Sequence, residues 1–594
     1  MSEQEIPAFL GVDCSLKEKR WRLRSQNERH GLALSQRLGI PEIVGRVLAG
    51  RNVGLDDAER YLSPTLREMM PDPSSFKDMD AASGRIVAAI QSGEAIAVFG
   101  DYDVDGATSS GLLKRFFDLL GVPLQVYIPD RLKEGYGPNK AAFDTLKKQG
   151  VALIITVDCG IVSFDVLDHA RDCGLDVVVV DHHQAETRLP NAVAVVNPKR
   201  HDESQDYTYL AAVGVTFLLC VAINRELRQG GWFGDENPPN LMRLLDLVAL
   251  GTVCDVVPLH GLNRAFVAQG LKVMARRENP GLVALGDVAG LDEAPGTYHL
   301  GYLLGPRVNA GGRVGKPDYG PQLLASNNPE ECQKLAGFLD QYNKERKDIE
   351  ATVTEEAMVV AEEAVKAQQA VLVVAGEGWH PGVIGIVASR LKDAFGRPAI
   401  VIGLDGEEGK GSGRSVPGVD LGAAIGAARH KDLILAGGGH AMAAGLTISR
   451  DKVSELAGFL NTRLSGDVLE ASRTSSLGLD GALGVEGATV ELINHLEMAG
   501  PYGAGNPEPR FVLSNARIVS AKIVGENHVR CILTGSGNRG RLVGICFRSL
   551  ETPLGDSLLS HRGASFHIAG HLRKNTWRGE TSAQILIEDA IRLS

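Results

Sequence analysis

The first half of the chain alternates short apolar runs with mixed segments of helical length. The apolar runs lie at residues 95–99, 151–157, 177–180 and 241–253. Residues 80–91 have the amphipathic pattern of a helix, and residues 210–225 form an apolar segment of helical length. Short buried strands that alternate with helices are typical of a parallel sheet with crossover helices. We therefore predict an α/β fold in which all four apolar runs are strands of one sheet.

The pattern changes after residue 320. Residues 334–366 contain few helix breakers, so we predict a long helix there, which is either a solvated surface helix or a connector between domains. A second α/β unit follows up to residue 465. The end of the chain carries five short apolar segments separated by Gly-rich turns, at residues 511–524, 529–534, 542–548, 566–572 and 583–588. Five such strands favour an OB-like β-barrel, with a plain β-sandwich as the alternative.

Length and composition bound the number of domains and the compartment. A chain of 594 residues is too long for one core, and its 44% hydrophobic and 23% charged residues are globular values. We expect a multidomain α/β protein with these parts: an N-terminal helical region (1–80), a parallel-sheet catalytic domain (81–320), a connector helix (321–368), a second α/β domain (369–465) and an OB-like nucleic-acid-binding barrel (471–594). The eight cysteines show no CxxC spacing, and neither a signal peptide nor a transmembrane run is visible. These features indicate a reduced, cytoplasmic protein without a membrane partner.

Acidic residues follow the first apolar run. Asp101, Asp103 and Asp105 come directly after residues 95–99 and before Gly106. Alternate residues of an extended segment point the same way, so the three carboxylates could share one side. Such crowding raises the pKa of each carboxyl group unless a cation neutralises the charges. By itself the run fits a divalent metal site and a solvated Asp/Gly turn equally well.

The other three apolar runs also end in residues that can bind metals. They are followed by Asp158, by Asp181-His182-His183 and by Asp255. Ligands of open parallel sheets bind outside the carboxyl ends of the strands, so these side chains would converge on one crevice. Carboxylate and imidazole ligands without thiolates suit Mn²⁺ or Mg²⁺, and a pair of such ions is the usual device for phosphoryl hydrolysis. An isolated Asp-His-His would more often be structural, but four such ends in order favour a two-metal site.

Together these segments resemble a known family. GDYDVDG (100–106), VDCG (157–160), DHH (181–183) and GTVCDVVPL (251–259) are similar to four successive motifs of the DHH phosphoesterase superfamily. GGGHAMAAG (437–445) resembles the signature of its companion DHHA1 domain. GPRVNAGGR (305–313) and WHPGVIG (379–385) resemble the RecJ family of bacterial single-stranded-DNA-specific exonucleases. The resemblance covers about residues 45–594.

The resemblance implies a set of metal ligands. One ion would be held by Asp103 and Asp158, and the other by Asp105, His182 and Asp255, with Asp158 shared between the two. Many members have a His four residues before the first metal aspartate, where this chain has Phe99. Asp101 or a neighbouring His could fill that place. His183 would face the substrate, where it could hydrogen-bond a phosphoryl oxygen or donate a proton, unless it is a packed core His.

The resemblance also implies contacts with nucleic acid. Ser412 and Arg414 lie in a Gly-rich segment that would grip the 5′ end, because small residues let the backbone approach phosphate and Arg forks onto its oxygens. Without the resemblance, this segment would be an ordinary turn. The other expected contacts are Arg131, Tyr136, Arg307, Asn309, Arg313, Gly438, Gly439 and His440. The barrel aromatics Phe511, Phe547, Phe566 and Trp577 lie among basic residues, as in single-strand binders, although any barrel core also needs aromatics.

The implied function is metal-dependent hydrolysis of single-stranded DNA from the 5′ end to 5′-mononucleotides, in DNA repair and recombination. The alternatives are a DHH phosphodiesterase acting on short oligonucleotides or cyclic dinucleotides, and a non-catalytic replication scaffold. The first would lack a barrel-like third domain, and the second would have lost motif acids that are intact here. The net charge of −11 is unusual for a nucleic-acid binder, so phosphate contacts would come from local patches. The residues give no signal for protein partners, but the resemblance suggests a single-strand-binding protein, a RecQ-type helicase and a monomer.

Overall fold

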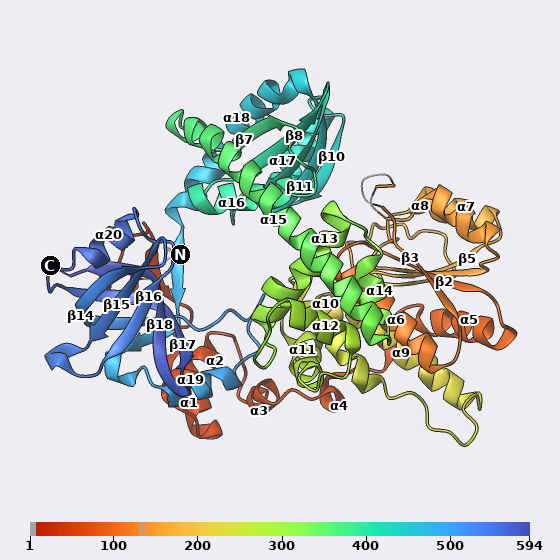
Figure 1. Ribbon diagram of the computed structural model, residues 1–594, viewed down its shortest axis with the longest axis horizontal. Helices are drawn as coiled ribbons and strands as arrows, with labels where there is room; N and C mark the ends of the chain where they lie inside the picture. The colour runs from red at the N-terminus through yellow and green to blue at the C-terminus, as the bar shows by residue number, and fades with distance from the viewer. Residues whose placement is uncertain (1–6, 131–133, 136, 594) are drawn as a thin grey trace, which may run out of the picture. The chain divides into compact units, whose positions relative to one another are not determined.

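The computed structural model describes residues 7–130, 134–135 and 137–593, and the chain folds into two compact units (Figure 1). One unit combines Met1–Met69, Pro258–Ala268 and Thr474–Ser594. The other combines Met70–Val257 and Gln269–Arg473. Both are discontinuous in sequence, and we describe each by itself.

A five-stranded parallel sheet organises the first part of the larger unit. Its strands are β2 (Ile96–Gly100), β3 (Leu124–Tyr127), β4 (Leu153–Val157), β5 (Asp176–Val180) and β6 (Ala194–Val196). Their order is β3-β2-β4-β5-β6, and every neighbouring pair is parallel. This is a doubly wound order whose switch point lies between β2 and β4. Every residue of β2 and β4 is buried, as expected for strands covered on both faces.

Helices cover both faces of this sheet. They are α5 (Met79–Ser92), α6 (Val104–Leu119), α7 (Lys140–Lys148), α8 (Phe164–Asp172) and α9 (Ala212–Gln229). Phe143 of α7 and Leu167 of α8 pack with Phe99 and Val179 in one apolar cluster. The predicted α/β domain is therefore confirmed, with β3 and β6 added to the strands expected from the apolar runs.

The prediction of a strand at residues 241–253 is wrong. These residues form a short 3₁₀ turn, Leu241–Leu244, and the helix α10 (Leu245–Cys254), which packs against α6 and α9. Residues 245–252 are all buried, so α10 has mostly apolar side chains on every face and shows no helical periodicity. An unbroken apolar run does not distinguish a buried helix from a buried strand. Asp255 therefore reaches the site from a helix end.

Further helices lead to a second sheet in the same unit. They are α12 (Pro280–Val288), the π-helix η5 (His299–Leu304), α13 (Gly305–Val314), α14 (Tyr319–Ala325) and α15 (Pro329–Lys366). The 38-residue helix α15 confirms the predicted long helix. The second sheet has the order β10-β11-β9-β8-β7, with strands β7 (Leu372–Glu377), β8 (Ala399–Asp405), β9 (Glu408–Arg414), β10 (Ala436–His440) and β11 (Ala443–Ser449). This sheet packs against helices α16 (Ile384–Phe395), α17 (Leu421–His430) and α18 (Val453–Arg473).

The smaller unit contains a closed five-stranded barrel. Its strands are β14 (Phe511–Val524), β15 (His528–Thr534), β16 (Leu542–Cys546), β17 (Ser565–Trp577) and β18 (Glu580–Arg592). Pairing of β14 with β17 closes the sheet, which confirms the predicted OB-like barrel. The N-terminal strand β1 (Arg20–Leu23) pairs with β12 (Ser476–Leu479), and the indole of Trp21 donates a 3.0 Å hydrogen bond to Asp589 of the barrel. Residues near both ends of the chain thus share one unit.

Candidate metal centre

The carboxyl ends of β2 and β4, at the switch point of the parallel sheet, carry the predicted acidic residues. Asp103 caps α6, because its carboxylate accepts hydrogen bonds from the backbone N–H groups of Asp105 and Gly106 at 2.9 and 3.1 Å. A Cβ atom on Gly106 would lie 2.4 Å from the carbonyl oxygen of Asp101, so only glycine lets the acidic loop fold back over the start of α6. This turn holds Asp101 and Asp105 in buried positions.

Asp158 follows β4 in a left-handed conformation with φ of 60°. Gly160, two residues later, also has a positive φ, and a Cβ atom there would lie 2.7 Å from the hydroxyl of Thr156. Left-handed non-glycine residues are uncommon, and they gather at functional sites. The Asp158 side chain is buried, and its Oδ1 has no hydrogen-bond partner. Burial and the charges of Asp103 and Asp105 raise its pKa well above the usual range.

His182 is fixed in one orientation beside these carboxylates. Its Nδ1 lies 3.1 Å from the carbonyl oxygen of Leu210, which can only accept, so Nδ1 carries the proton and Nε2 a lone pair. Nε2 has no hydrogen-bond partner and faces oxygens of Asp158 at 3.2 Å, Asp255 at 3.6 Å and Asp105 at 3.7 Å. Burial and the charge of His183 lower the pKa of His182 to about 3, so the ring is neutral. A divalent cation between them would satisfy the lone pair and the three carboxyl groups together.

Asp105 and Asp255 complete this group from α6 and α10. Asp105 accepts hydrogen bonds from the backbone N–H groups of Ala212 and Val213, at the start of α9, at 2.7 and 2.9 Å. Burial and the charge of Asp103 raise the pKa of Asp105 to about 7. Burial and the charges of Asp105 and Asp103 raise the pKa of Asp255 to about 9. The Oδ2 atom of Asp255 is buried and has no hydrogen-bond partner.

Two of the overlapping groups of donor atoms at this centre suit divalent ions. Ligand atoms of Asp105, His182 and Asp255 lie within 4.8 Å of one another, and so do those of Asp101, Asp103 and Asp158. The orphaned buried atoms of Asp158, His182 and Asp255 fit a cation that replaces their missing hydrogen-bond donors. Oxygen-rich sites with one imidazole suit Mn²⁺ or Mg²⁺. Phe99 points into the apolar cluster with Tyr127 and Phe143, whereas Asp101 lies in the second group.

Asp181 lies beside the centre, although the sequence analysis assigned no role to it. Its Oδ1 accepts hydrogen bonds from the backbone N–H groups of His182 and His183 at 2.7 and 3.0 Å, and lies 2.8 Å from Nδ1 of the His183 ring. Burial alone would raise the pKa of Asp181, but the hydrogen bonds and charge of His183 lower it to about 2. Burial alone would lower the pKa of His183, but the hydrogen bond and charge of Asp181, together with the charges of Asp103 and Asp101, raise it. Asp181 thus orients His183 and favours its protonated form.

The second sheet brings together most of the predicted phosphate-binding residues of its domain. In the register of β10, β11 and β9, His440 is level with Ala443, and Ala443 with Arg414. Gly438, Gly439 and His440 are exposed on β10, the edge strand of the sheet. Arg414 lies beside Ser412, with 3.2 Å from Nη1 to the hydroxyl oxygen. The glycine segment on β10 and Arg414 on β9 are therefore separated by a single strand, β11.

The remaining predicted contacts are placed differently. Arg307 of α13 forms an ion pair with Asp340 of α15 at 3.0 Å. Arg313 donates a 2.9 Å hydrogen bond to the carbonyl oxygen of Gly382, so it connects α13 to the segment before α16, and Asn309 is half-buried on α13. Arg131 and Tyr136 lie outside the residues that the structure describes.

Comparisons with known proteins agree with this architecture. The model of the DHH family, N-terminal domain, matches residues 95–252, that of the DHHA1 domain residues 368–466, and that of the RecJ OB domain residues 479–589. The single-stranded-DNA-specific exonuclease RecJ of Bacillus subtilis is 36% identical over 574 residues, which is 96% of this chain and 70% of that protein. The chain belongs to the RecJ family. The Escherichia coli RecJ protein is also 36% identical, over 93% of this chain and 96% of its own length.

Solved structures of RecJ proteins share the fold. The Thermus thermophilus RecJ structure in complex with Mn²⁺ covers 97% of this chain and 80% of its own, with 26% identity and a TM-score of 0.80. The same protein in complex with Mg²⁺ gives a TM-score of 0.76 at 25% identity. A further structure of exonuclease RecJ bound to manganese is 29% identical, covering 68% of this chain and 97% of its own, with a TM-score of 0.57. The ions in these relatives are those that suit the donor set of this chain.

Proposed function

We propose that this RecJ-family protein is a metal-dependent exonuclease that hydrolyses single-stranded DNA from the 5′ end to 5′-mononucleotides, in DNA repair and recombination. The observation that carries the proposal is the set of orphaned buried donors on Asp158, His182 and Asp255 at the switch point of the sheet. The names of the relatives support single-stranded DNA as the substrate. The RecJ OB domain match favours a long strand over a dinucleotide.

Two divalent ions, Mn²⁺ or Mg²⁺, would be held by the two groups of donors. We assign Asp105, His182 and Asp255 to one ion and Asp101 and Asp103 to the other, with Asp158 shared. When bound, such ions supply Lewis-acid stabilisation of phosphoryl charge and lower the pKa of water. Asp101 thereby takes the place of the His that Phe99 replaces.

The chain itself supplies a proton near this centre. His183 is half-exposed, its pKa is raised, and its Nδ1 lies 2.8 Å from Asp181 and 3.9 Å from Asp158. A protonated ring in this position donates a hydrogen bond to a phosphoryl oxygen or a proton to the leaving oxygen. Asp181 would not touch the substrate; it is a positioning residue that favours the charged form of His183.

The 5′ polarity requires a group that recognises the end of the strand. Arg414 and Ser412 suit this role, because an Arg fork and a hydroxyl match a terminal phosphate. Gly385 leaves space beside both, since a Cβ atom there would lie 2.9 Å from the Ser412 hydroxyl and 3.1 Å from the Arg414 guanidinium. We retain Arg131, Tyr136, Arg307, Asn309, Arg313, Gly438, Gly439 and His440 as proposed contacts along the strand. Arg307 would first have to leave Asp340.

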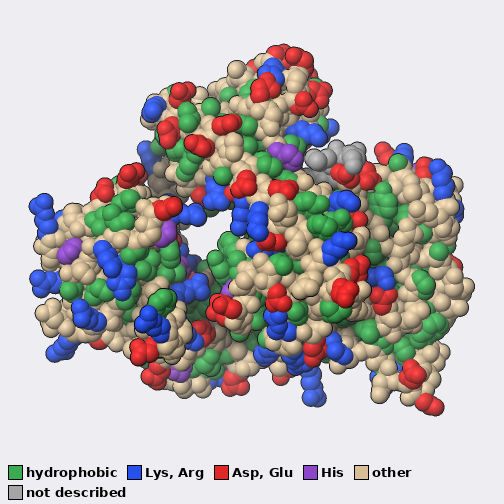
Figure 2. Space-filling view, viewed as in Figure 1, with side chains coloured by type: hydrophobic (Ala, Val, Ile, Leu, Met, Phe, Trp, Pro, Cys, Tyr) green, Lys and Arg blue, Asp and Glu red, His purple; other side chains and the backbone are tan. Residues whose placement is uncertain are grey.

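The barrel offers stacking positions for a single strand. Phe511 and Phe566 are core residues, whereas Phe547 and Trp577 are 56% and 70% exposed. The guanidinium of Arg578 lies over the ring of Trp577, with 5.9 Å to its centroid. Figure 2 shows Lys and Arg side chains scattered over the face of the barrel unit, in a protein whose net charge is −11. Exposed aromatics with basic neighbours suit a single strand.

One assay tests the reaction and its substrate. A 5′-labelled single strand, a duplex and a dinucleotide are incubated with Mn²⁺ or with chelator. We expect mononucleotides from the single strand, in the presence of Mn²⁺ only. Preferred cleavage of the dinucleotide would support the smaller-substrate phosphodiesterase, and no cleavage of any substrate would support a scaffold.

A second assay tests the polarity. Arg414→Ala removes charge-assisted hydrogen bonds worth about 1.5–3 kcal/mol each, so the preference for 5′-phosphate over 5′-hydroxyl strands should fall at least tenfold. The matched control is Arg429→Ala, an exposed arginine of α17 in the same domain. An unchanged preference in Arg414→Ala would place the 5′ recognition elsewhere.

Compartment and partners are also proposals. None of the helices in the described part of the chain combines the length and apolar character that a membrane span requires. All eight cysteines are free thiols, which suits a reducing compartment, and we propose that the protein acts in the cytoplasm. We further propose that the protein is a monomer. We also propose that it acts with a single-strand-binding protein and a RecQ-type helicase, because these partners would expose and present single-stranded DNA.

A further inference from the structure

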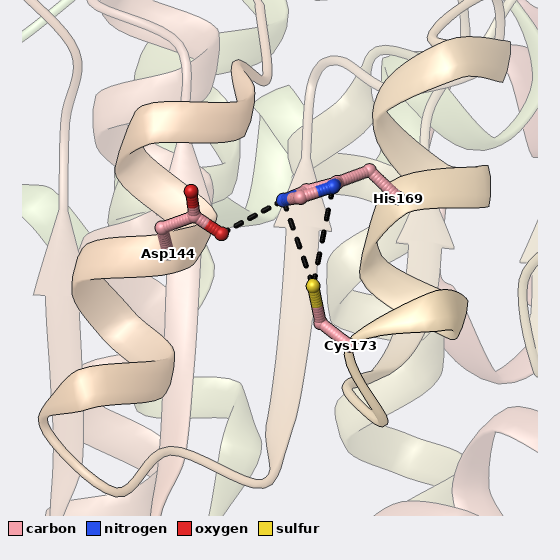
Figure 3. A group of neighbouring side chains, drawn as sticks. All are labelled: Asp144, His169 and Cys173. Carbon is pink, nitrogen blue, oxygen red and sulfur yellow. Dashed lines mark hydrogen bonds and ion pairs between the residues drawn. The ribbon is translucent and has the colours of Figure 1, made fainter.

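A second cluster of metal-ligating side chains lies on the outer side of helices α7 and α8 (Figure 3). Asp144 comes from the middle of α7, His169 from the last turn of α8 and Cys173 from the residue that ends α8. His169 and Cys173 are four residues apart, so they lie on the same face of α8. Asp144 and His169 are half-buried, and Cys173 is exposed.

This cluster is separate from the candidate metal centre. Cys173 lies three residues before β5 begins, whereas Asp181 directly follows the other end of that strand. A strand of five residues is about 17 Å long. The cluster therefore lies near the opposite end of the parallel sheet from Asp158 and His182.

The three donor atoms lie within 4.8 Å of one another. Nε2 of His169 lies 2.7 Å from Oδ1 of Asp144 and 3.6 Å from Sγ of Cys173. In tetrahedral zinc sites, bonds of about 2.05 Å to nitrogen and 2.3 Å to sulfur place these two donors about 3.6 Å apart. The observed nitrogen–sulfur distance has this value, but Sγ also lies only 3.9 Å from Nδ1, so it faces the ring and not the Nε2 lone pair. The exposed Cys173 side chain must therefore rotate toward the ring plane to share an ion with Nε2. The oxygen must move away by about 0.7 Å to reach the corresponding nitrogen–oxygen spacing, and Asp144 is exposed enough to do so.

The same geometry argues against an activated thiol of the Cys-His-Asp kind. In such a relay, the carboxylate binds one ring nitrogen and the sulfur faces the other. Here Asp144 bonds Nε2, and the sulfur is also closer to Nε2, at 3.6 Å, than to Nδ1, at 3.9 Å (Figure 3). The sulfur thus faces the ring at similar distances from both nitrogens, which is not the arrangement of a relay.

We propose that Asp144, His169 and Cys173 bind a zinc-class divalent cation, with water completing the coordination. The donor set selects such an ion, because thiolate and imidazole together suit Zn²⁺ and not the Mg²⁺ class. The complex of a dication with one thiolate, one carboxylate and one neutral imidazole carries no net charge. The bound ion ties the end of α8 to α7 and covers the only cysteine in the group. The proposal does not depend on the nuclease function.

The test uses the full chain, Co²⁺ as the probe, saturating Mg²⁺ and a reductant that does not bind metals. Ligation by a thiolate gives cobalt a sulfur charge-transfer band, which an all-oxygen and imidazole centre does not give. We expect one equivalent of Co²⁺ to produce this band and Zn²⁺ to abolish it. Cys173→Ser should lose the band, and Asp144→Asn should weaken Co²⁺ binding at least tenfold. Cys14→Ser is the matched control, since Cys14 is the other exposed cysteine among the eight.

A second measurement does not depend on spectroscopy. Zn²⁺ should slow alkylation of Cys173 at least tenfold while leaving that of Cys14 unchanged, as followed by peptide mass spectrometry. A band that persists in Cys173→Ser, no band in the wild type, or equal alkylation rates with and without Zn²⁺ would each overturn the proposal. The cluster would then be a hydrogen-bonded clamp between two helices.

Discussion

The substitution Asp181→Asn separates positioning of His183 from simple folding effects. Asp181 holds the ring of His183 through a 2.8 Å charge-assisted hydrogen bond. Such a bond is worth about 1.5–3 kcal/mol, and one pKa unit corresponds to about 1.36 kcal/mol. Loss of the charge should therefore lower the pKa of His183 by about one to two units. The variant keeps the size of the side chain, so the packing around it changes little.

The measurement is the pH dependence of kcat on a 5′-phosphorylated single strand at saturating Mn²⁺. If protonated His183 acts in the reaction, activity is lost as the pH rises through the pKa of His183. In Asp181→Asn this alkaline limb should move about one to two pH units lower. The matched control is Asp176→Asn, at the amino end of the same strand, where the carboxylate pairs with Arg85. A uniform fall in kcat with an unmoved alkaline limb would show that Asp181 is only structural.

Three further predictions follow from the same centre. Asp158→Ala should reduce hydrolysis to below about a hundredth of wild type, because the shared ligand serves both ions. Asp206→Ala, which changes an exposed aspartate, is the control and should leave hydrolysis unchanged. Turnover above that level in a folded Asp158→Ala variant would contradict the assignment. Phe99→His should lower the free energy of unfolding by about 2–4 kcal/mol without tightening Mn²⁺ binding, because position 99 faces the apolar cluster. Denaturant unfolding measures the change in stability, and Mn²⁺ titration measures the affinity for the ion. Folding raises the pKa of Asp105 to about 7 and that of Asp255 to about 9, from values near 4 in the unfolded chain. The two groups therefore contribute their full stabilisation below about pH 4, and this contribution is lost as the pH rises through about 7 and about 9. The melting temperature of the metal-free protein should therefore fall between pH 6 and 9, and Mn²⁺ should remove most of that fall; identical pH profiles with and without Mn²⁺ would count against the site.

The sequence predicted most of the elements that position the centre. Short apolar runs ending in Asp101 and Asp158 become β2 and β4, since buried parallel strands have few alternatives at that length. The five barrel strands were also predicted, because Gly-rich turns separate them. The apolar run that ends before Asp255 was wrongly predicted to be a strand. A helix that is buried on every side shows no 3.6-residue alternation of apolar and polar positions.

Other features of the centre were outside the reach of sequence reasoning. The N–H groups of Ala212 and Val213 and the carbonyl of Leu210 are backbone groups, so no side-chain pattern marks them. Asp181 did carry a signal, since it opens the Asp-His-His triplet at a strand end, but its role depends on the direction of its hydrogen bonds. The aromatics of the barrel divide into the buried Phe511 and the exposed Trp577 only once the barrel is closed.

The central claim is that two divalent ions share Asp158 between the two groups of donors. Anomalous diffraction from crystals soaked in Mn²⁺, recorded at the manganese absorption edge, tests it most directly. We expect two peaks about 3.5–4 Å apart, one beside His182 and Asp255 and one beside Asp101 and Asp103, with Asp158 between them. A single peak, or peaks that Asp158 does not contact, would contradict the account.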